Sequence, residues 1–172
     1  MNKTRLRKYA NLIARCGVNV QKGQEVIINA ELDQPEFVAM VVDECYKAGA
    51  SKVSVDWSYQ PLTKLNVRHC SKKVLESMDK WQLEKWEHQA EVLPCKIYLM
   101  SEDPDGLAGI NQKKFAGSMA ARSKLIKPIR NRMALTVTTC CVWRTTRSIC
   151  TRRCSVRSPL SVSVRSRVTR RS

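Results

Sequence analysis

The segment from Val18 to Ala30 constrains the fold more than any other part of this chain. Residues 21–24 read Gln-Lys-Gly-Gln, and Gly23 can adopt the positive φ that a tight turn requires. The β-branched run Val-Ile-Ile at 26–28 follows directly, so a short strand begins at this turn. Because its apolar residues do not alternate with polar ones, both faces of the strand should be covered, as in a parallel sheet with helices on either side.

Strands and helices alternate along the first 133 residues of the 172-residue chain. Strands are predicted at Glu25–Asn29, Lys52–Trp57 and Lys96–Met100. The second one alternates polar and apolar residues, so it should have one wetter face or lie at a sheet edge. The alternation is typical of an α/β fold, with a small parallel sheet flanked by helices and followed by a long helix and an irregular basic tail.

Helical periodicity fills the segments between these strands. Helices are predicted at 3–15, ended by Gly17; at 35–48, begun by Pro35 and ended by Gly49; at 59–68; at 71–77; and at 79–92, ended before Pro94. A further helix start is expected at Asp103 and Pro104. The last helix is capped by Asn111 and should be kinked near its end by Pro128.

The formal net charge of +16 is unevenly distributed along the chain. Residues 134–172 contain nine Arg and no Lys, Asp or Glu, whereas residues 1–133 contain 22 basic and 15 acidic residues. The basic side chains of the first part are interpreted as solvated helix surface. The second part has no Gly and no repeating pattern, so two units are predicted: an α/β domain at 1–133 and a disordered Arg/Ser/Thr/Cys-rich tail at 134–172.

The cysteines also divide between these two parts. Those of the first part lie about 25 residues apart in apolar contexts and are interpreted as reduced, buried thiols: Cys16, Cys45, Cys70 and Cys95. A cytoplasmic setting follows from this interpretation. The sequence has no signal-peptide core and no run of 18 apolar residues. The acid-free segment 1–24 also fits a mitochondrial presequence, although an ordinary first helix is the favoured interpretation.

Acidic residues cluster tightly at one place, where Glu102, Asp103 and Asp105 could offer oxygen ligands to a hard cation. The favoured interpretation is instead that they cap the helix expected at Pro104 and lie near the positive end of its dipole. No glycine-rich phosphate loop follows any predicted strand, so nucleotide binding has no support from a motif.

Cysteine and histidine residues offer two further candidate sites. A thiolate zinc site could be formed by the four tail cysteines, Cys140, Cys141, Cys150 and Cys154. Two adjacent cysteines, however, rarely both reach one ion. The pair His69-Cys70 and the separate His88 have no partners nearby in sequence, so neither is interpreted as a nucleophile with its base. We therefore predict no catalytic, metal-binding or cofactor-binding residue in this chain.

Several short motifs occur in order between Lys8 and Gly109. They read Lys8-Tyr9-Ala10, Asn19-Val20-Gln21-Lys22-Gly23-Gln24, Ala48-Gly49-Ala50, Val55-Asp56-Trp57 and Ser101-Glu102-Asp103-Pro104-Asp105 followed by Leu107-Ala108-Gly109. Together they resemble the N-terminal domain of bacterial metallo-aminopeptidases of the aminopeptidase T and aminopeptidase S type, which are similar to thermophilic leucyl aminopeptidases. The resemblance covers roughly 2–132 and includes the Lys127-Pro128 step.

The resemblance implies a cytoplasmic hydrolase that removes N-terminal residues from peptides. It further implies two divalent metal ions and a homodimer in the intact enzyme, with metal ligands (Glu, His and Asp) and a catalytic Glu and Tyr in a C-terminal domain. No specific nucleic acid and no membrane is implied as a partner.

The sequence departs from this family pattern just after Met133. A composition that abandons Lys, Asp, Glu and Gly at a single point is typical of an out-of-frame reading, so the tail is interpreted as a frameshift product. The expected function is that of an aminopeptidase fragment, inactive by itself because no family metal ligand or catalytic residue can be assigned to it. The alternative is a module that binds nucleic acid or an anionic surface through the tail arginines, which rising salt would abolish.

Overall fold

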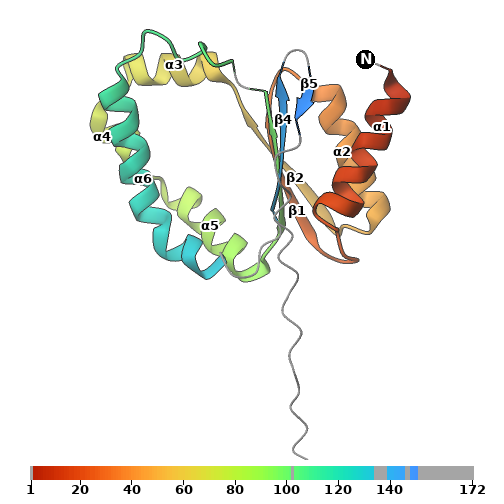
Figure 1. Cartoon of the computed structure of the whole chain (residues 1–172). Coiled ribbons are helices and arrows are strands. Elements are labelled where there is room, and N and C mark those ends of the chain that lie inside the picture. The colour runs from red at the N-terminus through yellow and green to blue at the C-terminus, as the bar shows by residue number, and fades with distance from the viewer. Residues whose placement is uncertain (1, 102, 134–138, 146–147, 151–172) are drawn as a thin grey trace, which may run out of the picture.

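The strands of this chain form one sheet with helices on both sides (Figure 1). The structure is a computed structural model that describes residues 2–101, 103–133, 139–145 and 148–150. The elements follow in the order α1 (Lys3–Leu12), a π-helical turn (Ile13–Gly17), β1 (Glu25–Glu31), α2 (Pro35–Ala48), β2 (Lys52–Ser58), α3 (Gln60–His69), α4 (Lys72–Glu76), α5 (Lys80–Val92), β3 (Cys95–Met100), α6 (Gln112–Met133), β4 (Thr139–Thr145) and β5 (Ser148–Cys150).

The strand order in the sheet is β2-β1-β3-β4-β5. The first four strands in this order run parallel, and β5 is antiparallel to β4. The small parallel sheet predicted from the sequence is therefore confirmed. The position of β2 at one end of the order also confirms the prediction that the alternating strand lies at an edge or has a wetter face.

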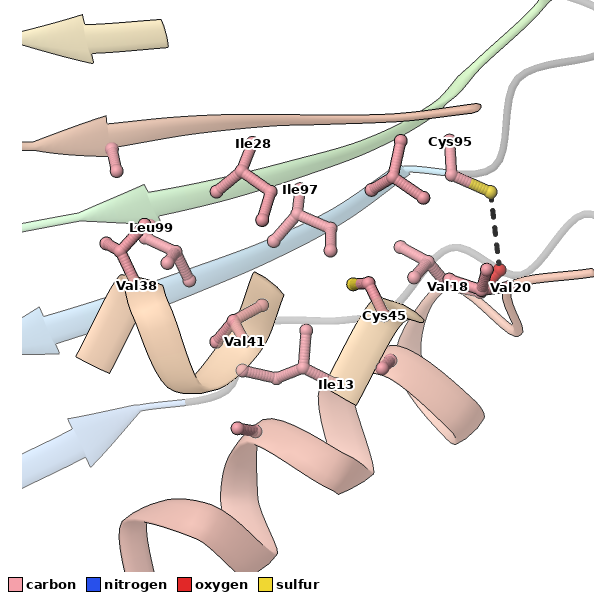
Figure 2. Packing of buried hydrophobic residues seen from close by; sticks show 14 of the residues in the cluster. Ile13, Val18, Val20, Ile28, Val38, Val41, Cys45, Cys95, Ile97 and Leu99 are labelled. Carbon is pink, nitrogen blue, oxygen red and sulfur yellow. Dashed lines mark hydrogen bonds between the residues drawn. The ribbon is translucent and has the colours of Figure 1, made fainter. Parts of the chain in front are cut away.

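The hydrophobic core lies between the sheet and helices α1 and α2. In β1 and β3 every second residue points toward these helices. Ile28 and Ile97 are paired in register on this face, and both are fully buried. Figure 2 shows how side chains from α2 and from the turn after α1 pack against them, including Ile13, Val18, Val38, Val41 and Cys45. Helices α3 to α6 lie on the other side of the sheet (Figure 1).

Three of the predicted turn and cap residues take the roles expected of them. Gly23 has φ +82° in the turn before β1, and Gly49 has φ +109° at the end of α2. Asn111 accepts a hydrogen bond from the backbone N–H of Lys114 at 3.0 Å and caps α6. Pro128 lies inside α6, which continues to Met133.

Two helix ends differ from prediction. Gly17 does not end the first helix in a left-handed conformation; the helix passes into the π-helical turn, and the positive φ of 49° falls on Asn19. Asparagine adopts this conformation more readily than other residues with a Cβ, which explains the shift. Asp103 does not start a helix, because residues 104–109 form successive turns instead.

The sheet continues past Met133, although irregular structure is predicted there from the sequence. Residues 139–145 form β4, which pairs with β3 in the register Ile97 to Cys140 and Leu99 to Val142. The segment contains Thr, Val and Trp, which favour strands, and the edge of β3 offers unpaired backbone groups to it. The division of the chain into two units at Met133 stays a prediction, and residues 151–172 of the tail lie outside the described residues.

None of the helices in the described residues has the length and apolar character needed to cross a lipid bilayer.

A buried carboxylate links α1 to α2. Glu44 accepts a hydrogen bond from Asn11 Nδ2 at 2.6 Å and one from Lys47 Nζ at 3.1 Å, and its residue is 5% exposed. The hydrogen bond from Asn11, with that from Lys47, lowers the pKa of Glu44 below its ordinary value of 4.5 despite burial. Folding therefore favours the ionised form of this side chain.

We expect Glu44→Gln to lower the free energy of unfolding by about 1 kcal/mol at neutral pH, because a charge-assisted acceptor becomes neutral. A carboxyl whose folded pKa is depressed stabilises the protein above its unfolded pKa, and this contribution is lost as pH falls through the folded pKa. Urea unfolding should therefore show the difference at neutral pH and show it shrinking in acid. Asp43→Asn is the control, since Asp43 also contacts Lys47 but is 53% exposed. An equal loss in both variants would contradict the prediction.

Candidate functional site

The sheet face directed away from α1 and α2 is unusually polar for a parallel sheet. Three neighbouring strands contribute to it at alternate positions: Ile27 and Asn29 from β1, Asp56 from β2, and Lys96 and Tyr98 from β3. Parallel strands covered by helices are generally apolar on both faces. The polar side chains on this covered face therefore mark it as the part of the domain where function is best sought.

A cavity of about 190 Å³ lies between this face and the helices α5 and α6. The same five sheet residues form its floor, and Met78 adds an apolar side chain from the loop before α5. The helices add aromatic, amide and cationic side chains: Trp81, Gln82, Lys85, Trp86, Gln89 and Arg122. At about 30 Å³ per molecule in the liquid, this volume corresponds to about six waters, so the cavity is large enough for a small organic molecule.

Lys96 is the most deeply buried charged group of the cavity, with 7% of the residue exposed. Its Nζ donates a hydrogen bond to Gln89 Oε1 at 2.8 Å and lies 4.7 Å from the ring centroid of Trp86, a cation–π distance. Gln89 is itself buried. Burial lowers the pKa of Lys96, which Asp56 opposes and Lys85 reinforces.

Among the other charged side chains of the cavity, cations outnumber carboxylates. Lys85 Nζ forms an ion pair with Asp56 Oδ1 at 2.6 Å. Arg122 donates a hydrogen bond to Gln82 Oε1 at 3.3 Å. Among the described residues, the lining thus holds Lys85, Lys96 and Arg122 against the single carboxylate of Asp56, so the cavity is suited to an anion.

These residues do not fit a divalent metal ion. Hard cations need several carboxylate or carbonyl oxygens, and zinc needs histidine, thiolate or carboxylate ligands. The lining residues that the structure describes include one carboxylate and no histidine or cysteine. Elsewhere within the described ranges, no group of three or more His, Cys, Asp or Glu residues could hold a metal ion.

The structure describes only Asp103 and Asp105 of the acidic cluster, because Glu102 lies outside the described residues. Asp103 accepts a hydrogen bond from the backbone N–H of Asp105 at 3.1 Å and so stabilises a turn, not a helix. Gln60 of α3 holds this turn through two hydrogen bonds to the backbone of Asp103. The interpretation as a helix cap is therefore wrong in detail.

The cysteines and histidines are dispersed. Burial raises the pKa of Cys45 to about 12 and that of Cys95 to about 11, so both are inert thiols in the core. Cys16 is exposed and Cys70 is half-buried, which corrects the expectation that all four are buried. His69 ends α3, and Nε2 of His88 in α5 lies 3.6 Å from Oε2 of Glu25.

The tail cysteines considered as a zinc site fall partly in strands. Cys140 and Cys141 lie in β4 and Cys150 ends β5, whereas Cys154 lies outside the described residues.

Sequence reasoning missed the cavity, although a signal for it was present. Polar residues recur at spacing two in the second and third strands, at Ser54 and Asp56 and at Lys96 and Tyr98, and the first strand adds Asn29. Such spacing places them on one face of a sheet. The side chains of α5 that complete the cavity could not be assigned to this face before its packing was known.

Comparison with known proteins identifies relatives of this chain. A family described as thermophilic metalloprotease (M29) matches residues 2–149. Aminopeptidase AmpS of Bacillus subtilis is 34% identical over 126 residues, which are 73% of this chain and 31% of that protein. Aminopeptidase T of Thermus thermophilus is 28% identical over 126 residues, again 73% of this chain and 31% of that protein.

A solved structure has the same fold. The wild-type AmpT structure from Thermus thermophilus aligns with a TM-score of 0.72 and 25% identity, covering 83% of this chain and 36% of that one. The chain therefore spans about a third of the length of the relatives that it matches.

Proposed function

Because this chain belongs to the thermophilic metalloprotease family (M29), we propose that it forms the N-terminal part of a metal-dependent aminopeptidase acting on peptides. The observation that carries the proposal is the family match over residues 2–149 together with relatives named as aminopeptidases. The resemblance described above assigns the two metal ions, the homodimer and the cytoplasmic location to the intact enzyme, and these belong to the proposal as well.

The role proposed for this chain within such an enzyme is structural. Its cavity carries excess positive charge, which would repel divalent cations, and the carboxylates of Asp56 and Glu44 are each paired with a lysine. We therefore propose that the ligands for metal ions come from the part of the relatives that this chain does not match, and that the present chain is inactive by itself.

We expect the purified chain to release no N-terminal residue from an aminoacyl chromogenic substrate with zinc, cobalt, manganese or magnesium. Peptide hydrolysis requires a very large rate enhancement, which in metallo-aminopeptidases comes from metal-activated water. Bacillus subtilis AmpS, assayed in parallel, is the positive control. Turnover by this chain that needs metal and that a chelator abolishes would contradict the prediction.

A chimera tests the family role directly. Residues 2–132 of this chain would replace the matching stretch of Bacillus subtilis AmpS, and the product would be assayed with the same substrate and metals. If the domain has the proposed role, the chimera should recover metal-dependent turnover that the remaining part of AmpS lacks by itself. A chimera that folds, as judged by circular dichroism, yet remains inactive would count against the proposal.

A further inference from the structure

We propose that the cavity between the sheet and helices α5 and α6 is a binding site for a small anion that carries a flat apolar group. The anionic group would contact Lys96 and Arg122, and the apolar group would lie against Trp86 and Trp81. This inference goes beyond the proposed peptidase function and does not rest on it.

The buried charge of Lys96 is only partly balanced by the groups around it. Its ammonium carries three N–H donors, of which Gln89 accepts one, and the ring of Trp86 faces the charge. Among the described residues, no carboxylate forms an ion pair with Lys96, and the segments outside them contain a single acidic side chain, Glu102. A buried charge that is only partly balanced is costly, and an anion in the adjoining cavity would compensate for it.

The other charged side chains that line the cavity are Asp56, Lys85 and Arg122. Asp56 is engaged by Lys85 at 2.6 Å, so its carboxylate is already neutralised by a partner on α5. Arg122 enters the same cavity from α6 and donates a hydrogen bond to the neutral amide of Gln82. A guanidinium is well suited to carboxylates and phosphates, since its planar N–H groups can bind two oxygens at once.

The size and lining of the cavity fit an organic ligand. Its volume of about 190 Å³ exceeds what one inorganic ion fills, and two indole rings form part of its wall. Indole faces bind flat apolar groups and also favour nearby cations. The ligand is therefore a small organic anion, whose charged group is a carboxylate or a phosphate.

Matched probes test the proposal with the complete chain. Benzoate, phenyl phosphate and the neutral benzamide share one ring and differ in charge, so isothermal titration calorimetry at constant ionic strength separates the anionic contribution. We expect saturable binding of benzoate, phenyl phosphate or both, and at least tenfold weaker binding of benzamide. Whichever anion binds more tightly identifies the charged group. Equal binding of benzoate and benzamide, or heats that depend on salt alone, would overturn the proposal.

Variants then assign the site. Lys96→Met and Arg122→Met should each weaken anion binding by about tenfold or more, the loss expected for a charge-assisted hydrogen bond. Lys80→Met is the matched control, because Lys80 lies on α5 with its side chain 91% exposed. Asp56→Asn should strengthen binding, because it frees Lys85 from its ion pair and leaves the positive charge of that lysine for the ligand. Anion affinity that is unchanged in both Lys96→Met and Arg122→Met would refute the site. If Lys96→Met does not fold, Arg122→Met alone tests the site, because Arg122 is only half-buried.

Discussion

Replacing Ile97 with alanine should lower the free energy of unfolding by about 2–5 kcal/mol, the largest effect expected of any single substitution considered for this domain. Ile97 is fully buried in β3 and faces α2, where it packs among Ile28, Val41 and Cys45 (Figure 2). Deleting three carbons there loses their transfer free energy and leaves a cavity that close-packed neighbours on a parallel sheet cannot fill.

Urea unfolding followed by circular dichroism measures this loss. Leu125→Ala is the matched control, since it removes the same number of carbons from a side chain that is 50% exposed on α6. The control should stay within about 0.5–1 kcal/mol of wild type. If Ile97→Ala changed the unfolding free energy no more than Leu125→Ala, the sheet would not have the core described for it.

The second large effect is expected at Gly49, which ends α2. Gly49 has φ +109°, and a Cβ there would lie 3.2 Å from Lys22 Cα. Its N–H donates to the carbonyl of Tyr46 at 2.9 Å, its carbonyl accepts from Gly23 N–H at 2.8 Å, and Ala50 N–H donates to Cys45 at 3.1 Å. These bonds hold the backbone in a conformation that an L side chain strains, so Gly49→Ala should cost about 1–3 kcal/mol.

The control for Gly49 is the same substitution where the backbone is helical. Gly117 lies within α6, and apart from its chain neighbours and the adjacent helix backbone, no described atom lies within 4 Å of the Cβ that alanine would add. Gly117→Ala should therefore stabilise the protein by about 0.5–1 kcal/mol. Unfolding curves for the two variants should shift in opposite directions. A shift of the same sign in both would show that the conformation of Gly49 is not what limits its replacement.

Local signals in the sequence were sufficient where one residue dictates the backbone. Gly23, Gly49 and Asn111 take the turn and cap roles predicted for them, because positive φ and side-chain capping depend on neighbours within a few residues. Asp103 and Gly17 show the limit of such signals. Each has a side chain or backbone compatible with two local structures, and packing selected a turn after Asp103 and a π-helical turn through Gly17.

Sequence alone determined the positions of the first three strands and the parallel α/β class, because both depend on the pattern of apolar residues along the chain, and its short motifs carried the resemblance to the family. Only the tertiary structure decided that Thr139–Thr145 joins the sheet, since a strand in that position depends on the free edge of β3. The cavity was likewise decided in three dimensions. Lys96, Gln89 and Arg122 come from three separate elements, and whether a lysine lies in solvent or beneath a helix depends on how those elements pack.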